Sequence, residues 1–537
     1  MPHKKIKKVI SKIKSATCSP LPPKINALIK AFQDKAFSLK EDVLARPIYG
    51  TTLYLATCSV DMRMGAFKAY IFQDIIHKGY VIALTYGNVE AADTLYVRLH
   101  SSCVTSETLR GCDCDCVQQL ESAFNLIVEK GSGILFYLMQ EGRGIGYVAK
   151  ARDRMLVQAT NDQISTFDAY EMLGLHRDYR QYRNIKDICF LLNIQASFVL
   201  LTNNPDKVQA MQRQNIHVAA TETLEIEPSP YNLAYLTSKM EYGHILEKPM
   251  DATTKRIALP EEVVPFAPYA LEDAQRFVYA ASYMLPVRPI DGEVVLSLRE
   301  EELRHYFKDE PIDSYIERED PLIVKYNMIR NNRVMVTIHE RNMTTFQRRE
   351  PESPLAKLLT TPYWFRTHVY FDTITGEDFV VLTYGDLKTD ELPVVRLHSE
   401  SIFNRFPVKD MDNREKFKAT VKEIIRYGVG VIVMLYNDGR GAGFGAYSQD
   451  KMLTQLGLSH DTNESYHKLG VSYDRRDYEA AIMLLKHHIY GNKVQMVMNS
   501  PASLIKKKEY AEALNKHNID VEEWIFLEHN KRNGNDA

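Results

Sequence analysis

The sequence predicts an α/β protein in which one module is present twice. The segment VRLHS at residues 97–101 recurs at 395–399, and similar elements follow it in the same order. Strand-like apolar runs alternate with helix-like stretches in both copies, which favours α/β sandwiches with mixed sheets. Four cysteines crowd into residues 103–116 of the first copy, and the second copy has none. We therefore expect two tandem α/β sandwich domains, of which only the first has a metal site.

The composition is typical of a globular protein with several domains. The 537 residues are 45% hydrophobic and 25% charged, and the formal net charge is −2. Because domains usually hold roughly 100–200 residues, the chain has room for several. A chain this close to neutrality, with no long apolar run and no signal-peptide core, has no general attraction for nucleic acid or membranes. We expect a cytoplasmic protein with neither as a partner.

Residues 1–44 form a basic N-terminal extension that begins MPHKKIKKVISKIK. Its apolar residues have helix-like spacing, so a targeting segment or an anionic-surface anchor is one interpretation. We expect a solvated tail instead.

The predicted elements follow one another in the same order in both copies. Apolar runs bounded by glycine are typical of buried strands, and apolar residues at i, i+3 and i+4 indicate a helix. By these criteria the first copy holds strands at 80–87 and 134–138, a helix at 118–130 and a glycine-rich segment at 140–146, and the second copy holds strands at 378–385 and 431–435 and a glycine-rich segment at 437–443.

These matches define the expected domains. The first copy spans residues 45–245 and the second spans 360–530. Residues 246–359 between them form a linker or a small insert domain, because prolines and charged stretches accompany enough apolar residues for a small core. A helix is expected there at 298–309. No chemical role is assigned to this segment.

The cysteines of the first copy have the spacing of a metal site. In Cys114-Asp115-Cys116 an extended backbone would place both thiols on one side, and Cys103 could supply a third. Three protein ligands leave one tetrahedral position open, as in catalytic zinc sites. A water bound there would ionise near neutral pH and become a nucleophile. Ordinary buried cysteines are the alternative interpretation, and the tight clustering speaks against it.

Two further segments have the composition of a phosphate site. Glycines within 141–146 allow a ligand to approach the backbone, and Arg143 could hold phosphate oxygens. Turn glycines beside a solvated arginine are the alternative. Asp178 and Arg180 would share a face of an extended segment, and Lys207 could meet a phosphate. A salt-bridged surface would have the same composition.

Taken in order, these segments resemble the GTP cyclohydrolase II family, the enzymes that open the guanine ring of GTP at the head of riboflavin synthesis. The resemblance covers most of the first copy. It implies hydrolysis of GTP with release of formate and pyrophosphate, giving 2,5-diamino-6-ribosylamino-pyrimidinone 5'-phosphate. The segments that carry it are VRLHSSC at 97–103, CDC at 114–116, QEGRGIG at 140–146, DYRQY at 178–182 and LTNNPDK at 201–207.

The resemblance also implies roles for single residues, one Zn²⁺ per chain in the first copy, and Mg²⁺ bound with the triphosphate. Asp178 matches a proton acceptor, and Arg180 matches a nucleophile toward the α-phosphate. Because a guanidinium keeps its proton, with a pKa above about 12, we favour Arg180 as a clamp on that phosphate. The implied zinc ligands are Cys103, Cys114 and Cys116, and the implied GTP-binding residues are Arg98, Leu99, His100, Ser101, Ser102, Gln119, Glu141, Gly142, Arg143, Thr166, Thr202 and Lys207.

Both copies depart from the family pattern. In the first copy, Arg154 stands where a tyrosine near the reacting base is expected, and residues 168–170 read DAY where the family has EAN. In the second copy, Ser401 replaces the first zinc ligand. Several polar matches nevertheless survive there, namely Arg396, Arg440, Thr462, Asp474 and Arg476.

The second copy has two interpretations. We favour a scaffold that replaces the second subunit of the family's homodimer, which would make the chain an intramolecular pseudo-dimer able to form homo-oligomers. A regulatory nucleotide site without hydrolysis is the alternative.

Three functions stay open for the whole chain. The first is a zinc-dependent hydrolase with GTP, a small-molecule nucleotide, as its partner. The second is a paralogue that acts on another nucleotide or in pyrimidine catabolism, for which the change at Arg154 leaves room. The third is a non-catalytic nucleotide sensor, which would have no need for a metal with an open position.

Overall fold

The computed structural model describes residues 46–244 and 276–527 with short gaps, together with Leu44, Leu259 and Val263. Residues 1–47 and 48–537 are separate compact units, and the fold concerns the second. Most of the basic N-terminal extension lies outside the described residues. The gaps are 225, 227, 230, 288–292, 308–310, 318–321, 330–332, 351, 361–362, 389–391, 410–411, 437 and 500–503.

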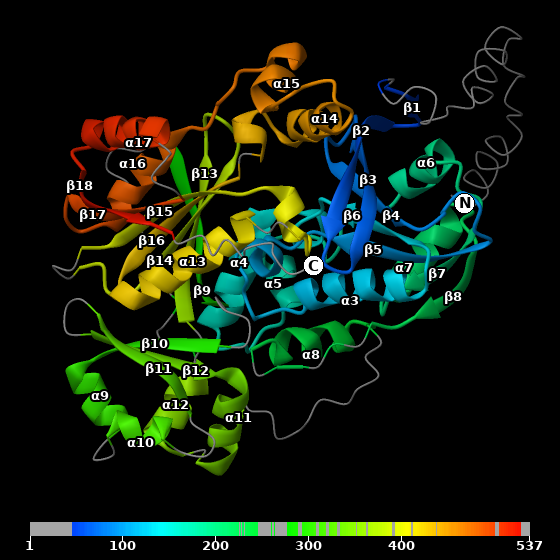
Figure 1. Ribbon diagram of the computed structural model, residues 1–537. Helices are drawn as coiled ribbons and strands as arrows, with labels where there is room; N and C mark the ends of the chain where they lie inside the picture. Colours follow the sequence, from blue (N-terminus) through cyan, green and yellow to red (C-terminus); the bar gives the residue numbers. More distant parts are fainter. Residues whose placement is uncertain are drawn as a thin grey trace, which may run out of the picture. The chain divides into compact units, whose positions relative to one another are not determined.

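The first copy is built on an eight-stranded mixed sheet with the strand order β1-β2-β3-β4-β6-β5-β7-β8. The strands β1 to β4 are antiparallel neighbours, whereas β6, β5, β7 and β8 run parallel (Figure 1). Its elements are β1 (Ile48–Tyr49), β2 (Thr52–Met62), β3 (Gly65–Asp74), β4 (Tyr80–Tyr86), β5 (Thr94–Ser101), β6 (Gly133–Leu138), β7 (Ser197–Leu201) and β8 (Val218–Glu222), with α3 (Cys116–Glu129), α4 (Tyr147–Ala159), α5 (Thr166–Met172), α6 (Asn184–Leu191), α7 (Pro205–Arg213) and α8 (Leu233–Glu241).

Local sequence signals explain where these elements lie. Every residue of β6 is buried, which is why it reads as a continuous apolar run. The helix expected at 118–130 is α3, whose buried face includes Leu120, Phe124 and Ile127. A capping box between Ser165 and Asp168 begins α5, since each residue hydrogen-bonds to the backbone of the other.

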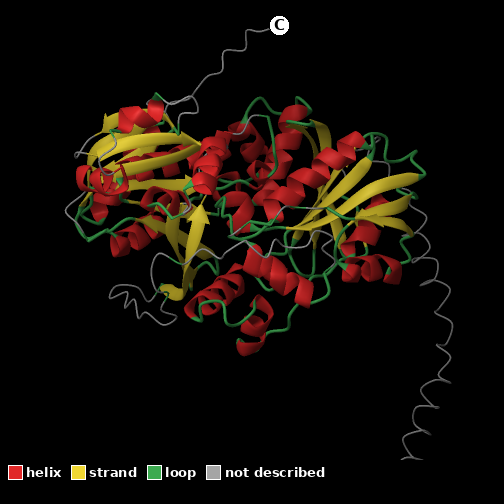
Figure 2. Cartoon of the chain, turned by 90° about the horizontal axis from the view of Figure 1, so that it is seen from below, coloured by secondary structure: helices red, strands yellow, loops and turns green. Residues whose placement is uncertain are grey.

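The second copy repeats this topology in a seven-stranded sheet with the order β18-β17-β15-β16-β14-β13-β9. The predicted α/β architecture with two large mixed sheets is thus confirmed, and Figure 2 shows helices packed against both. No helix in the described part of the chain is both long and apolar enough to span a bilayer. The elements are β9 (Phe277–Val287), β13 (Tyr363–Asp372), β14 (Asp378–Tyr384), β15 (Val394–Ser399), β16 (Gly430–Leu435), β17 (Lys493–Met498) and β18 (Asp520–Phe526), with α13 (Asp412–Tyr427), α14 (Phe444–Gln455), α15 (Thr462–Leu469), α16 (Tyr478–His488) and α17 (Leu504–Lys516).

A third, three-stranded sheet with the order β10-β12-β11 lies in the chain between β9 and β13. Because β9 pairs with β13 as β2 pairs with β3, this insert interrupts a hairpin of the second copy. The second sheet therefore takes one strand from before residue 360, and the expected domain boundaries stay a prediction. The helix expected at 298–309 is α9. The elements are β10 (Glu293–Arg299), β11 (Ile323–Ile329) and β12 (Arg333–His339), with α9 (Glu300–Phe307), α10 (Ile312–Ile316), α11 (Glu340–Arg349) and α12 (Pro354–Thr360).

The two copies contact each other through two matching interfaces. Helix α4 of the first copy packs on β9, and α14 of the second copy packs on β2. In the first interface, the side-chain amide of Gln158 pairs with both backbone groups of Met284, at 2.7 Å each. In the second, Gln455 pairs with both backbone groups of Ser59, at 2.7 and 3.0 Å. Such reciprocity is typical of halves related by an approximate two-fold axis.

Candidate active site

A cavity of about 740 Å³ opens in the first copy at the carboxyl ends of the parallel strands β5 and β7. Ligands of open α/β sheets bind at this edge. The helices α4, α5 and α8 supply further walls, and Pro286 and Trp364 of the second sheet close one side. The cavity is therefore built from both copies.

Three cysteines converge on this cavity. Cys103 follows β5, a π-helical turn at Val104–Thr108 comes next, and Cys116 begins α3. Their sulfur atoms, with that of Cys114, all lie within 4.8 Å of one another. The expected extended Cys-Asp-Cys segment is not found. A bend leads into α3 instead, so convergence depends on the start of the helix rather than on strand alternation.

The geometry of the cluster fits a metal ion. Zinc–sulfur bonds of about 2.3 Å in a tetrahedron place the sulfur atoms about 3.8 Å apart, and the sulfurs of Cys103 and Cys114 are 3.7 Å apart. Contacts with Cys114 and Cys116, and the nearby Lys150 ammonium, lower the pKa of the Cys103 thiol. Cys112 is not part of the cluster. Among the described residues, this group could hold a metal through three thiol ligands.

Lys150 of α4 contacts the cysteine cluster and lines the cavity. Its Nζ lies 3.0 Å from the Cys103 sulfur and 2.6 Å from Glu141. Glu141 also accepts a hydrogen bond of 2.7 Å from the backbone N–H of Val104. Burial raises the pKa of Glu141 to about 6, against the opposing effect of Lys150. The predicted GTP-binding residue Glu141 is thus placed to hold the cysteine turn and Lys150, and its side chain does not line the cavity.

Cations crowd the end of the cavity near β7. The Nζ of buried Lys207 donates to the carbonyl oxygen of Leu99 at 2.7 Å, and Arg98 donates to the carbonyl oxygen of Leu201 at 2.7 Å. Burial, then repulsion from Arg98 and Arg180, lowers the pKa of Lys207. A bound anion would relieve this repulsion, so the arrangement suits a phosphate group. Leu99 contributes its backbone, because its side chain is buried in the sheet.

Arg180 and Asp178 form a bidentate pair beside these cations. The Nε of Arg180 lies 3.0 and 2.9 Å from the two carboxylate oxygens, and a terminal nitrogen also contacts the carboxylate. Although burial opposes both charges, Tyr182 and then the pairing with Asp178 raise the pKa of Arg180, and the pairing lowers the pKa of Asp178. Asp178 therefore stabilises the protonated guanidinium, which favours the clamp interpretation of Arg180.

Most of the other predicted residues also reach the cavity. Gln119 accepts a hydrogen bond of 2.5 Å from Arg98, and Arg143 lies over the ring of Phe167 at 3.8 Å. Four predicted residues do not line the cavity: besides Leu99 and Glu141, Cys114 is buried within the cluster and Asp178 is turned to Arg180. The predicted residues that line the cavity are Arg98, His100, Ser101, Ser102, Cys103, Cys116, Gln119, Gly142, Arg143, Thr166, Arg180, Thr202 and Lys207.

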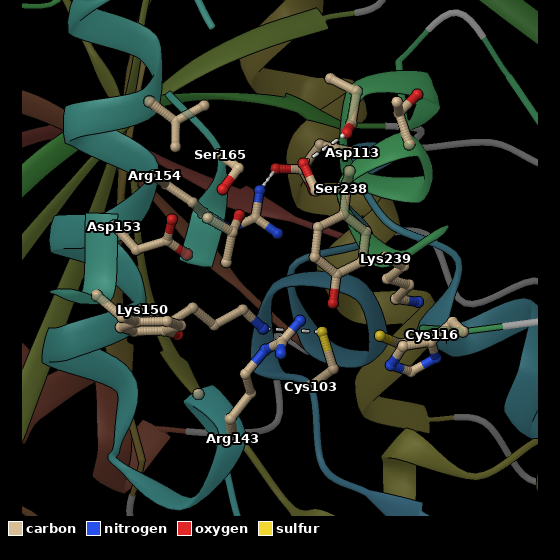
Figure 3. Close-up of a pocket in the computed structure, with 18 of the residues that line it drawn as sticks. Cys103, Asp113, Cys116, Arg143, Lys150, Asp153, Arg154, Ser165, Ser238 and Lys239 are labelled. Atoms are coloured by element: carbon tan, nitrogen blue, oxygen red, sulfur yellow. Dashed lines mark hydrogen bonds and ion pairs between the residues drawn. The ribbon is translucent and has the colours of Figure 1, made fainter. Parts of the chain in front are cut away.

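Several cavity residues were not among those expected to bind zinc or GTP. Figure 3 shows Lys150, Asp153 and Arg154 of α4 at the cavity, with Lys150 reaching Cys103 and Arg154 turned to Asp113. Their i, i+3, i+4 spacing directly after the glycine loop is a signal that could have been used. Arg154 pairs with Asp113 inside the cavity. Burial raises the pKa of Asp153 to about 8. No residue of α8 was expected at the cavity from the sequence.

The second copy keeps the polar framework without the thiols. Arg476 pairs with Asp474, and Arg396 donates to the carbonyl oxygen of Val497 at 3.0 Å. Tyr447 occupies the place equivalent to Lys150, and the ring centroid of Phe403 lies 5.7 Å from that of Tyr447. Two aromatic rings therefore pack together in the second copy, at the positions that Thr105 and Lys150 occupy in the first.

The GTP cyclohydrolase II sequence profile matches the chain twice, at residues 54–223 and 353–525. The chain belongs to the GTP cyclohydrolase II family. The two matches confirm the tandem arrangement expected from the sequence, and membership identifies the chain as a hydrolase of this family.

Curated relatives match one copy. The chain is 37% identical over 196 residues to GTP cyclohydrolase-2 of Shewanella baltica, covering 36% of this chain and 94% of the relative. It is 37% identical over 199 residues to GTP cyclohydrolase-2 of Hahella chejuensis, covering 37% and 94%. A riboflavin biosynthesis protein of Vibrio vulnificus is 35% identical over 211 residues, covering 39% and 56%.

Among solved structures, the chain matches a two-domain 3,4-dihydroxy-2-butanone 4-phosphate synthase of A. baumannii. The TM-score is 0.20 at 15% identity, and the match covers 33% of this chain and 41% of the other. A score this low supports no structural argument.

Proposed function

We propose that the first copy hydrolyses GTP with zinc bound at Cys103, Cys114 and Cys116. The reaction opens the imidazole ring and releases formate and pyrophosphate, giving 2,5-diamino-6-ribosylamino-pyrimidinone 5'-phosphate, as in riboflavin biosynthesis. The observation that carries the proposal is the convergence of three thiols and several cations in one cavity. When bound, zinc would supply a Lewis acid and an activated water for opening the ring.

The two ends of the cavity would bind different parts of the nucleotide, the triphosphate at one end and the base at the other. We assign Arg98, Arg180 and Lys207 to the triphosphate, which Mg²⁺ would accompany. Arg180 stabilises charge on the α-phosphate as a fixed cation, because Asp178 holds it in place with bidentate contacts. The base then lies toward the cysteines, where Lys150 keeps the Cys103 sulfur in its anionic form.

We further propose that the second copy replaces a second subunit, so the chain is an intramolecular pseudo-dimer. The reciprocal packing of α4 on β9 and of α14 on β2 supports this assignment. The loop before Cys114 also depends on the second sheet, since the N–H of Cys112 donates to the carbonyl oxygen of Pro286 at 2.8 Å. The packing of Phe403 on Tyr447, which stands in place of Lys150, favours a scaffold over a regulatory nucleotide site.

Purified, metal-analysed full-length protein tests the proposal in one assay with GTP and Mg²⁺. We expect formate and pyrophosphate from the wild type, with about one zinc per chain as three-ligand catalytic sites hold. Cys114→Ser should lose the metal and formate release while the circular dichroism spectrum stays unchanged. Formate release by a zinc-free Cys114→Ser protein would contradict the metal assignment, and neither product from zinc-loaded wild type would contradict the substrate.

A second candidate is the same hydrolytic chemistry on another nucleotide, including one of pyrimidine catabolism. The observation that favours it is the Arg154–Asp113 pair, which places two charges in the cavity where a tyrosine is expected. The same assay run with GTP, ATP, UTP and CTP separates the candidates. Turnover of a pyrimidine nucleotide without turnover of GTP would select the second.

A further inference from the structure

Helix α8 forms one wall of the cavity and is tied to the cysteine loop. The Nζ of Lys239 lies 2.7 Å from a carboxylate oxygen of Asp115, which stands between two of the cysteines, and both side chains are nearly buried. In Figure 3, Ser238 and Lys239 approach the cavity opposite Lys150 and Asp153 of α4. This side of α8 therefore faces the reaction space.

Tyr235 lies on the same face of α8. It precedes Lys239 by four residues, one helical turn, and the Lys239 Nζ lies 4.5 Å from its ring centroid. Tyr235 lines the cavity together with Cys116 and Arg180. It also interacts electrostatically with Cys116, Cys114 and Arg143. The phenol thus stands between the cysteine cluster and the arginines of the phosphate end.

The hydroxyl of Tyr235 has no hydrogen-bond partner within the described part of the chain, although it stands among charged groups. Three cations near the cysteines already have acidic partners, namely Lys150 with Glu141, Arg154 with Asp113 and Lys239 with Asp115. A fourth, Arg143, lies over the ring of Phe167. A donor in a polar cavity without a protein partner is available to a ligand. A phenol has an ordinary pKa of about 10, so it keeps its proton near neutral pH.

We propose that Tyr235 is a catalytic residue that donates a hydrogen bond to the bound nucleotide next to the cysteine cluster. The inference rests on the proposed function and deepens it. Hydrolysis of the ring adds a hydroxyl group to carbon C8, breaks a bond from C8 to a ring nitrogen and leaves a proton on that nitrogen. A fixed neutral donor stabilises the negative charge that develops on the base as this bond breaks.

Tyr235→Phe removes the hydroxyl and keeps the ring, so the packing of α8 is preserved. We expect kcat for formate release to fall about 10²-fold, the range found when one fixed donor is removed. KM for GTP should change less, because the phosphate contacts remain. Zinc content and the thermal midpoint should equal those of the wild type.

Tyr242→Phe is the matched control, because Tyr242 directly follows the last residue of α8. The Tyr242 ring stacks on Phe167 at 3.8 Å, and its hydroxyl donates to Asp168 at 3.3 Å, so it is a neighbour of α8 that does not line the cavity. It should keep full turnover. Wild-type kcat in Tyr235→Phe would overturn the inference and leave the proposed function standing. An equal loss in both variants would assign the effect to the packing of α8 and overturn the inference as well. A wild type without any turnover of GTP would overturn both.

Discussion

Replacing Arg405 by methionine tests how strongly the two copies depend on each other. Arg405 belongs to the second copy, yet its guanidinium donates to the hydroxyl of Tyr137 in the first copy at 3.2 Å. It also donates to Glu400 at 2.6 Å. The Tyr137 hydroxyl donates in turn to Glu107 at 2.5 Å. All four side chains are buried, so methionine would leave the Glu400 carboxylate without its cation and the Tyr137 hydroxyl without this donor.

The expected loss follows from the burial of this network. Removing one partner of a buried ion pair typically costs about 3–5 kcal/mol, because the remaining charge stays desolvated. Methionine fills most of the arginine volume, so little of the loss comes from an empty cavity. The double variant Glu400→Gln with Arg405→Met should be less destabilised than Arg405→Met alone, since it removes the carboxylate that Arg405→Met leaves unpaired.

Urea unfolding followed by tryptophan fluorescence measures these changes. The control is Arg304→Met, because the Arg304–Glu300 pair has a similar distance of 2.8 Å but side chains 80% and 68% exposed. Exposed pairs contribute about 0.2–1 kcal/mol, so this variant should unfold near the wild-type midpoint. If Arg405→Met unfolded at the same urea concentration as Arg304→Met, the reasoning about the buried network would be refuted.

Three further outcomes are expected. With Trp524→Phe leaving Trp364 as the single tryptophan, saturating GTP should quench or shift its emission, and unchanged emission would remove Trp364 from the cavity wall. Burial, then His487, lowers the folded-state pKa of His488 to about 3, whereas the unfolded value is about 6.5. Neutral His488 therefore costs no stability above about pH 6.5, and the folded state loses stability as the pH falls below that value because only the unfolded chain takes up the proton. His488→Gln should therefore flatten the decline of the thermal midpoint between about pH 7 and pH 5, and an unchanged decline would contradict the assignment. Arg180→Lys should lower pyrophosphate release by about 10²-fold, because lysine cannot make the bidentate contact, and wild-type turnover would remove Arg180 from the mechanism.

The sequence predicted those features that depend on local pattern. The apolar runs bounded by glycine predicted β4, β6, β14 and β16, and the spacing of the cysteines predicted the cluster around Cys103. Each of these signals lies within a short stretch of chain, where periodicity and residue type are informative. The role of Glu141 could not be predicted from the sequence. Glu141 follows β6 as expected, but only the fold shows that its side chain pairs with Lys150.

The features that escaped prediction join distant parts of the chain. Strand β9 has no local mark of its partner β13, because the insert separates two strands that pair directly elsewhere in the repeat. For the same reason, Trp364 gave no sign that it lies at the cavity of the other copy. Tyr235 and Lys239 belong to a helix for which the sequence suggested no role, and Lys239 meets the cysteine loop through the ion pair with Asp115, which lies 124 residues away in the chain.

The insert joins the second sheet next to the cavity wall. The chain enters the insert after Val287 and returns to the sheet at Tyr363, and these two residues are cross-strand neighbours. The next pair along the same two strands is Pro286 with Trp364. That next pair lines the cavity. A molecule that bound the insert and displaced its attachment would therefore move the wall against which a nucleotide lies. If that molecule changed the affinity for the nucleotide by some factor, thermodynamic linkage requires the nucleotide to change the affinity of the insert for that molecule by the same factor. The attachment of the insert would therefore couple two separate binding sites.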